Sequence, residues 1–323
     1  MPELTYAQAV NEGIREEMRR DPNVVVLGED VGKYGGVFGV TKGLYDEFSG
    51  ARVRDCPLNE AAIVGFGIGL AISGKPAIAE LEFMDFATFA MDPIVNQAAK
   101  IRYFWGGQVS VPLVVRMPVA AQLGFGTQHS QSLEAWFMHM PGLKVAMPSN
   151  GYDAKGLIKT AIRDPNPVIF IENISLYAAK SQIPDEEYLL PFGQAEIKRE
   201  GDDVTVVALA AMAPRALQAA EALAQQGLSV EVIDPRTLAP LDIETIVASV
   251  KKTGRLVVTH MAHKTGGVGA EIAQQVSERA FSYLDAPVMR VAAADVPLAA
   301  SQELEMAAYP SVQSIVEACL SFQ

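Results

Sequence analysis

The stretch PLNEAAIVGFGIGLAISGKPAIAELE, residues 57–82, contains the pattern that decides the fold. A helix is expected to start at Asn59 or in the neighbouring turn and to continue through Ala71. The apolar residues from Lys75 to Glu82 then predict a short strand, and another strand is expected just before the helix, over 51–56. The stretch therefore predicts a strand–helix–strand unit.

The same alternation extends outward in both directions through the first half of the chain. Further strands are predicted over 23–27, 111–116, 143–147 and 167–172. Further helices are predicted over 6–20, with Thr5 as the N-cap, and over 89–103 and 152–163. Strands that are apolar on both faces and alternate with helices are typical of a parallel sheet covered by helices.

The second half repeats this organisation on a smaller scale. Residues 181–193 are rich in Pro and Glu without a clear period, and they predict a linker. Beyond it, the expected strands are 204–210, 229–234, 255–259 and 288–292, and the expected helices are 214–226, 243–252 and 267–281. We therefore predict an α/β protein with one domain over 1–180, a linker over 181–199 and a second domain over 200–323.

Composition excludes some classes of function. The 323 residues are half hydrophobic, which is enough for a sizeable core, and carry a net charge of −12. This acidic balance argues against nucleic-acid binding, which needs a positive surface. The polar N-terminus and the absence of a long apolar run argue against a membrane segment. Two distant cysteines, Cys56 and Cys319, fit a reducing compartment, so a cytoplasmic protein is expected.

Glu60 is the first candidate for a chemical role, because it opens a very apolar helix. Burial would raise its pKa, whereas the positive end of the helix would lower it. Its residue type and position fit either a first-turn acid that favours the helix dipole or a buried acid that shares a proton with a heterocycle. Gly65, Gly67 and Gly69 imitate a dinucleotide fingerprint, but they lack the GxGxxG order.

His129 is the second candidate, since it lies in a polar loop after a strand, where functional residues are common. Its neighbours do not form a serine-hydrolase site, because no GxSxG motif is present. His260 and His263 are expected to follow a strand, and the lack of a third ligand argues against a zinc site. Core packing is the first expectation for the aromatic residues Phe83, Phe86 and Phe89.

Five segments together resemble one known family. They are LGEDVGKYGGVFGVTKGL (27–44), PLNEAAIVGFGIGLAISGKPAIAELEFMDF (57–86), TQHSQSLEAWFMHMPGLKVAMPSN (127–150), DAKGLIKTAIRDPNPVIF (153–170) and VIDPRTLAPLD (232–242). They resemble the beta subunits of the decarboxylating component of 2-oxo-acid dehydrogenases, which are transketolase-like thiamin-diphosphate enzymes. The resemblance covers nearly the whole chain in order, and it implies a pyrimidine-binding domain followed by a transketolase C-terminal-like domain.

The resemblance implies roles for residues at matching positions. Glu60 matches the acid that hydrogen-bonds the aminopyrimidine ring of the cofactor, and Phe86 matches the aromatic residue that stacks on that ring. His129 matches the histidine that handles protons around the decarboxylated intermediate and the incoming lipoyl group. Glu29 lies in the matching cofactor-facing loop. Catalytic roles are thus implied for Glu60 and His129, and cofactor contacts for Glu29, Glu60 and Phe86.

The resemblance also implies ions and partners. Ala161, Asp164 and Asn166 match a loop that holds a structural potassium ion in relatives, largely through carbonyl oxygens. The magnesium and diphosphate motif of thiamin enzymes is missing, since the closest string, Gly201-Asp202-Asp203, lacks the final glycine. The diphosphate and magnesium are therefore expected on a separate alpha subunit, in an α2β2 heterotetramer that serves a lipoyl-bearing acyltransferase core. Asp285 is a candidate contact for a basic domain of that core.

The segments around 133–145 and 154–168 look most like pyruvate dehydrogenase beta chains. Branched-chain 2-oxo-acid and acetoin dehydrogenases share most of the same strings, so they remain alternatives for the substrate. A different class of alternative is a non-catalytic assembly subunit, against which the joint presence of Glu60, Phe86 and His129 argues. The missing diphosphate motif argues against a self-contained thiamin enzyme.

Overall fold

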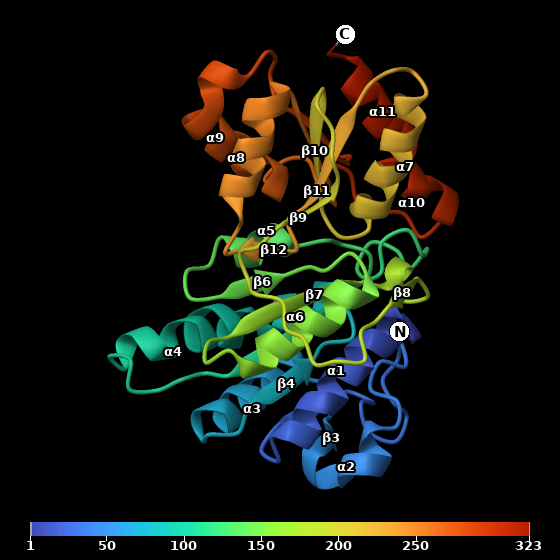
Figure 1. Cartoon of the computed structure of the whole chain (residues 1–323). Coiled ribbons are helices and arrows are strands. Elements are labelled where there is room, and N and C mark those ends of the chain that lie inside the picture. The colour runs from blue at the N-terminus through green and yellow to red at the C-terminus, as the bar shows by residue number, and fades with distance from the viewer. Residues whose placement is uncertain (1, 323) are drawn as a thin grey trace.

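The computed structural model describes residues 2–322, which form two α/β units stacked one above the other (Figure 1). The first unit has a seven-stranded sheet in the order β12-β6-β7-β5-β4-β2-β3. Its strands are β2 (Val25–Gly28), β3 (Val53–Asp55), β4 (Ala77–Glu80), β5 (Leu113–Val119), β6 (Lys144–Ala146), β7 (Val168–Asn173) and β12 (Thr237–Ala239). Every neighbouring pair is parallel except β12 and β6. The predicted parallel sheet is therefore confirmed.

Helices cover this sheet. They are α1 (Tyr6–Arg20), α2 (Leu44–Arg52), α3 (Glu60–Ile72), α4 (Ala99–Phe104), α5 (Glu134–Met138) and α6 (Gly151–Arg163). Among them, α1, α3 and α6 match predicted helices. The predicted N-cap Thr5 is confirmed, and with Gln8 it forms a capping box at the start of α1. Helices α1 and α6 pack together closely. Gly13 permits this approach, since a Cβ at this position would lie only 2.6 Å from Ile158 Cγ2.

The second unit is a five-stranded sheet in the order β14-β13-β10-β11-β9. Its strands are β9 (Glu196–Arg199), β10 (Val204–Ala208), β11 (Val230–Asp234), β13 (Leu256–His263) and β14 (Met289–Ala293), and only the β9–β11 pair is antiparallel. Helices α8 (Ile243–Thr253) and α9 (Val268–Ala280) lie on one side of it, and α7 (Met212–Ala224) and α11 (Val312–Leu320) on the other (Figure 1). The short helix α10 (Gln302–Ala308) lies at the lower edge of this unit, facing the first unit.

The helix predicted over 89–103 is wrong as a single α-helix. The structure divides this region into the 3-10 helix η1 (Met84–Ala90), the π-helix η2 (Asp92–Ala98) and α4. Pro93 stands in the first turn of η2 and has no N–H to donate, so a continuous α-helical hydrogen-bond ladder cannot pass through it. Residues 51–52, predicted as strand, belong to the end of α2, which was not predicted.

Three other departures concern strands. The segment predicted as a linker contains β8 (Lys180–Gln182), which pairs with β1 (Glu3–Thr5), and also β9, which lies at the edge of the second sheet. His260 and His263 were predicted to follow a strand, but they lie within β13, which pairs with β14 as far as His263. The second half of the chain also supplies β12 to the first sheet. The exact division into domains stays a prediction.

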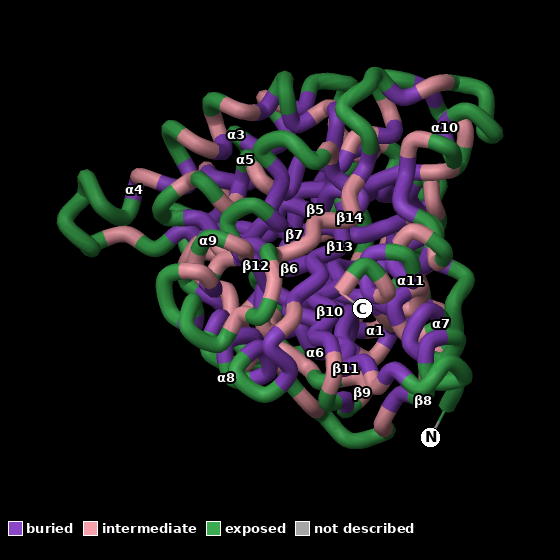
Figure 2. The backbone as a smooth tube through the Cα atoms, turned by 90° about the horizontal axis from the view of Figure 1, so that it is seen from above, coloured by how far each residue is buried: buried purple, intermediate pink, exposed green. Residues whose placement is uncertain are grey.

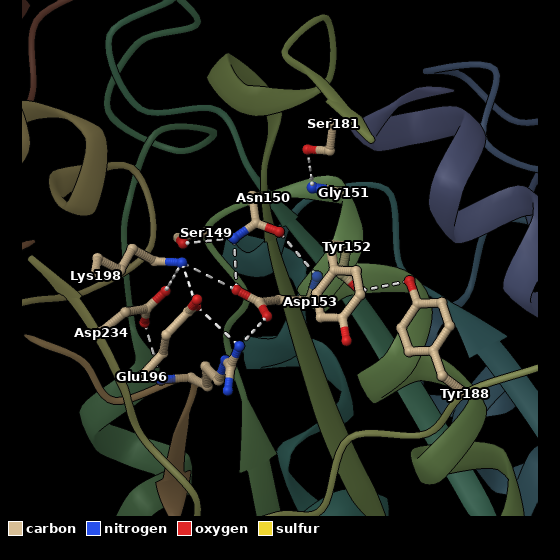
Figure 3. A network of polar contacts seen from close by, with 11 residues as sticks. Ser149, Asn150, Gly151, Tyr152, Asp153, Ser181, Tyr188, Glu196, Lys198 and Asp234 are labelled. Carbon is tan, nitrogen blue, oxygen red and sulfur yellow. Dashed lines mark hydrogen bonds and ion pairs between the residues drawn. The ribbon is translucent and has the colours of Figure 1, made fainter. Parts of the chain in front are cut away.

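A buried polar network joins the two units (Figure 3). The Asp153 carboxylate, on α6, accepts a hydrogen bond from the Asn150 side-chain amide, and the Asp153 N–H donates one to the Asn150 side-chain oxygen. The carboxylate also forms an ion pair with Arg236 over 2.7 Å. Lys198, on β9, lies 3.3 Å from Asp153 and 3.7 Å from the carboxylate of Asp234. Burial raises the pKa of Asp234 to about 6, although the charge of Lys198 opposes this. The network therefore links charges of both units that would be costly to bury alone.

Arg116, on the central strand β5, is the largest fully buried side chain among residues 2–322. Figure 2 shows that the residues of β5 are buried along the strand. The guanidinium binds Glu172, on β7, over 2.6 and 2.9 Å, and it also donates a hydrogen bond to Glu80, on β4. Burial raises the pKa of Glu80, while the Arg116 charge lowers it. One cation thus neutralises carboxylates on both neighbouring strands.

Within residues 2–322, no helix is long and apolar enough to span a bilayer.

Replacing Arg116 with Met is expected to destabilise the chain strongly, because two buried carboxylates lose their counter-charge. The expected loss in the free energy of unfolding is about 3–5 kcal/mol. Arg279→Met is the control, since Arg279 pairs with Glu244 at the surface and should cost at most about 1 kcal/mol. Urea denaturation measures both, and equal losses would contradict the assignment of Arg116 as the central counter-charge.

Candidate functional site

Glu60 is the first residue of α3, and Asn59 determines where that helix begins. The Asn59 side chain accepts a hydrogen bond of 2.9 Å from the Ala62 N–H, as an N-cap does. Only 8% of Glu60 is exposed. Among residues 2–322, no side chain or N–H donates a hydrogen bond to its carboxylate, and none forms an ion pair with it. A buried acid without a partner in its own chain is available to a ligand.

Other acids lie near Glu60 at the carboxyl ends of neighbouring strands. Glu29 follows β2 and Glu82 follows β4. Burial raises the pKa of Glu29, and the charges of Asp30 and Glu60 add to the effect. Burial and the charges of Glu29, Asp30, Glu80 and Glu60 raise the pKa of Glu82 to about 7. We call Glu29, Asp30, Glu60 and Glu82 the acidic group.

Glu82 was missed from the sequence, although one signal could have found it. Ligands of parallel α/β sheets bind beyond the carboxyl ends of the strands, and Glu82 lies two residues after the end of β4. A search for acids at these positions would have selected Glu29 and Glu82 together.

The structure brings the predicted residues Phe86 and His129 together. Their ring centroids are 5.1 Å apart, and the two rings meet edge to face. The ring of Phe83 is 4.8 Å from His129 and 5.5 Å from Phe86, so it completes the group. Among residues 2–322 neither ring nitrogen of His129 has a hydrogen-bond partner, and the residue is half-buried. Both nitrogens of His129 are therefore available for proton transfer.

Core packing, the first expectation for the aromatic residues, holds for only part of the cluster. Phe83 is buried, whereas Phe86 is half-buried and Phe89 is 69% exposed. All three lie on or just before η1, which packs against α3. The aromatic group and Glu60 are therefore carried by elements that contact each other.

The loop from 120 to 133 carries His129 from the end of β5 to α5. Gly124 and Gly126 have φ angles of +75° and +85°, which a side chain would strain. Beyond the histidine, Asp85 accepts two hydrogen bonds from Gln131, at 2.7 and 3.3 Å. Burial raises the pKa of Asp85, and the bonds from Gln131 oppose the increase. Turns and buried acceptors thus determine the path of this loop.

Ala161, Asp164 and Asn166 lie together, away from the other predicted residues. They precede β7 and so lie at the amino edge of the sheet, whereas the acidic group lies at the carboxyl edge. The Asp164 N–H donates to the Ala161 carbonyl oxygen over 3.2 Å. One carboxylate oxygen of Asp164 accepts two bonds of 2.9 Å from Asn166, and the other pairs with Lys144.

His260 and His263, the pair considered for a zinc site, lie on β13 in the second sheet. His260 is buried, and burial lowers its pKa to about 4, so its ring is neutral near pH 7. Its ring packs closely against Gly267 and Gly269, where a Cβ would lie 2.5 and 2.9 Å from ring atoms. Nδ1 of His263 lies 2.7 Å from the Ala294 carbonyl oxygen. Neither histidine belongs to the site around Glu60.

Large apolar side chains are exposed next to the candidate site. Leu58, two residues before Glu60, is 72% exposed. Phe125, whose ring is 5.5 Å from Phe83, is 46% exposed, and Tyr34, in the loop after β2, is 71% exposed. A hollow of about 600 Å³ also borders Asn59 and is lined mainly by apolar groups, Phe66 among them. Exposed apolar surface of this kind is typical of an interface.

Comparisons with known proteins agree with the two-unit fold. Residues 2–180 match the family "Transketolase, pyrimidine binding domain", and residues 193–315 match "Transketolase, C-terminal domain". The chain resembles a solved "Split gene transketolase, inactive beta4 tetramer" with a TM-score of 0.83 over 98% of both chains. The identity there is 23%, so this likeness concerns the fold alone.

Curated relatives are similar over nearly the whole chain. "Pyruvate dehydrogenase E1 component subunit beta-1, mitochondrial" from Oryza sativa subsp. japonica is 47% identical over 98% of this chain and 86% of that protein. "2-oxoisovalerate dehydrogenase subunit beta" from Bacillus subtilis is 47% identical over 92% and 91% of the two chains. "Acetoin:2,6-dichlorophenolindophenol oxidoreductase subunit beta" from Cupriavidus necator is 45% identical over 98% and 96%. The chain therefore belongs to the transketolase-like family of 2-oxo-acid dehydrogenase E1 beta subunits.

Proposed function

We propose that this chain, with an alpha subunit, catalyses the thiamin-dependent oxidative decarboxylation of a 2-oxo acid, with pyruvate as the first candidate. The acid loses carbon dioxide, and its acyl group passes to one sulfur of a lipoyl disulfide while the other sulfur is reduced to a thiol. The observation that carries the proposal is Glu60, a buried and unpaired acid on a helix that packs against the element bearing Phe86.

Glu60 and Phe86 fit the pyrimidine half of thiamin diphosphate. The cofactor, when bound, supplies a carbon nucleophile and stabilises the negative charge left by decarboxylation. Glu60 would share a proton with a ring nitrogen, which an unpaired buried acid can do without breaking a bond in the protein. Phe86 would cover the face of the ring. Glu29, in the acidic group, would line the same side of the site.

His129 would hold and deliver protons beside the reacting carbon. Its two free nitrogens can bind the carboxylate of the substrate and then protonate the lipoyl sulfur that leaves. The edges of Phe83 and Phe86 restrict the orientation of the imidazole ring.

The other half of the site is proposed to come from the alpha subunit, in an α2β2 heterotetramer. The string Gly201-Asp202-Asp203, closest to a diphosphate motif, is already used in packing. Asp203 accepts a bond of 2.7 Å from the Ser229 N–H, and a Cβ at Gly201 would lie 2.2 Å from the Val230 backbone. Magnesium and the diphosphate would therefore be held by alpha, whose surface would cover the exposed apolar residues near Glu60.

The remaining parts of the proposal concern partners and location. The acceptor would be a lipoyl-bearing acyltransferase core, and Asp285, exposed after α9, is a candidate contact for a basic domain of it. Unchanged core binding by Asp285→Lys would remove that candidate. A cytoplasmic location is proposed because both cysteines, Cys56 and Cys319, are free thiols.

A potassium ion is proposed at the loop of Ala161, Asp164 and Asn166. The Asp164 carboxylate is occupied by Lys144 and Asn166, so carbonyl oxygens would have to be the ligands. Among residues 2–322, no hydrogen bond is donated to the carbonyl oxygen of Asp164 or of Asn166. Free carbonyl oxygens at a tight turn are suitable ligands for a hard cation.

Glu60→Gln is expected to lower activity by at least about 10²-fold, because the amide cannot share a proton in the same way. The assay is reduction of an artificial electron acceptor by the assembled alpha and beta chains, with thiamin diphosphate and magnesium. Glu221→Gln, at an exposed position on α7 that has no ion-pair partner within the described residues, is the control and should keep full activity.

Pyruvate, branched-chain 2-oxo acids and acetoin are compared in this assay, and the preferred substrate separates the dehydrogenase types. Full activity of beta alone would contradict the shared site. An assembled mixture that is inactive on every substrate would instead favour a non-catalytic assembly subunit.

Glu82→Gln is expected to raise the Tm of the chain, and this gain over the unmodified chain should increase with pH. The pKa of Glu82 is about 7 in the folded chain, above its ordinary value of 4.5, so the ionised carboxylate destabilises the fold. This cost is small at low pH and grows as the pH rises through the folded pKa. The gain in Tm should be larger near about pH 8 than near about pH 5.5, as differential scanning fluorimetry can measure. A gain independent of pH would contradict the electrostatic origin.

Potassium is expected to raise the Tm of the chain above its value in choline chloride of equal ionic strength, since an ion that binds the folded state stabilises it. Asp164→Ala should remove the difference, because it breaks the bonds that shape the loop. Asp202→Ala, at an exposed position, should retain it. Equal Tm values in the two salts for the unmodified chain would argue against the ion.

A further inference from the structure

The loop that bears His129 is held from outside its own domain. We propose that Glu305 and Tyr309, from the C-terminal domain, are positioning residues that keep His129 in its reactive orientation. This inference rests on the proposed function, because it presupposes that His129 acts in the reaction.

Glu305 grips the start of the loop with both carboxylate oxygens. It lies on α10 and is fully buried. Its Oε1 accepts a hydrogen bond of 3.0 Å from the Gln122 N–H, and its Oε2 accepts one of 2.6 Å from the Gly124 N–H. A carboxylate that accepts bonds from two backbone N–H groups forms charge-assisted bonds, which are stronger than neutral ones.

The conformation of the gripped turn is unusual. Gln122 has a φ angle of +70°, which a residue with a Cβ seldom adopts, and Gly124 has one of +75°. The two N–H groups converge on one acceptor because of these angles. Glu305 therefore stabilises a backbone shape that the local sequence does not favour by itself.

Tyr309 holds the other side of the loop, directly beside the histidine. Its hydroxyl donates a hydrogen bond of 2.6 Å to the carbonyl oxygen of Ser130, the next residue after His129. Burial raises the pKa of the Tyr309 hydroxyl, so it stays protonated and remains a donor. The two residues thus fasten the loop at 122–124 and at 130, with His129 between.

Arg215 ties this support to the rest of the second domain. From α7 it donates a hydrogen bond of 2.8 Å to the Pro310 carbonyl oxygen and another to the Gln122 side chain. Ala300 also lies beside Gly126: a Cβ added at Gly126 would be 3.6 Å from the Cβ of Ala300. The segment from 300 to 310 therefore forms one continuous support for the loop.

Loss of either contact should lower the catalytic rate, because catalysis is sensitive to the position of the reacting groups. A shift of about 1 Å in a reacting group can lower a rate by about 10²-fold. Glu305→Gln replaces one acceptor oxygen with an NH2 group that would face a backbone N–H, so one of the two hydrogen bonds to the loop is lost. Glu60 is on a different element, so binding of thiamin diphosphate should not change.

The test compares Glu305→Gln and Tyr309→Phe in the assembled enzyme, with Glu303→Gln as the control. Glu303 lies on the same helix and is exposed, so its variant should match the unmodified enzyme. Both test variants are expected to lose about 10- to 100-fold in kcat per active site. The KM for the 2-oxo acid and the activation constant for thiamin diphosphate should change by less than about 3-fold.

The decisive readout is a double-mutant cycle with His129→Ala. If Glu305 and Tyr309 act through His129, their substitutions should cause no further loss in the residual rate of the His129→Ala enzyme. The same fold loss in both backgrounds would overturn the inference, as would unchanged kcat in Tyr309→Phe. Tyr309→Phe keeps the packing of the ring, so it carries the test if Glu305→Gln does not assemble. If His129→Ala itself retains full activity, the proposed role of the histidine fails, which is a different result.

Discussion

The arrangement of the first domain depends on one buried cation. Arg116 lies in the middle of the seven-stranded sheet and binds carboxylates on the strands to its two sides, Glu80 and Glu172. Burying three charges is costly, and the cost is offset only when each has a partner in good geometry. The requirement fixes the lateral register of β4, β5 and β7 near their carboxyl ends. The segments that bear Glu82, Phe86 and His129 begin at these ends. The ion cluster formed by Arg116, Glu80 and Glu172 therefore determines where the site residues lie.

Above that cluster, the charges are no longer balanced within the chain. Among residues 2–322, no basic side chain forms an ion pair with the acidic group, and burial raises the pKa of two of its members, Glu29 and Glu82. Exposed apolar side chains, Leu58 and Phe125 among them, lie beside it. Uncompensated carboxylates and exposed apolar side chains are both unfavourable in the isolated chain. A polar ligand that binds the carboxylates and a second protein surface that buries the apolar side chains would make this surface stable. The chemistry and the assembly of the family therefore have a common physical origin.

Local signals in the sequence predicted much of this structure. The N-cap Thr5 and the apolar period behind it predicted α1, and Asn59 predicted the start of α3 and so the position of Glu60. The signals failed where distant contacts decide. Strand β12 has three residues and exists because it pairs with β6. Pro93 accounts for the break in the helix predicted over 89–103, but no local signal predicted the π-helix that follows it. Glu305 is separated from Gly124 by 181 residues and has no local mark of its role.

Strand β12 has a consequence for how this protein can be divided. It comes from the second half of the chain, yet it forms the edge of the first sheet next to β6. A fragment cut in the predicted linker would leave β6 as an uncovered edge, which invites pairing with other chains. It would also lose Arg236, the partner of the buried Asp153. The two units therefore cannot be exchanged as independent modules in gene fusions or recombination, even though each has its own sheet.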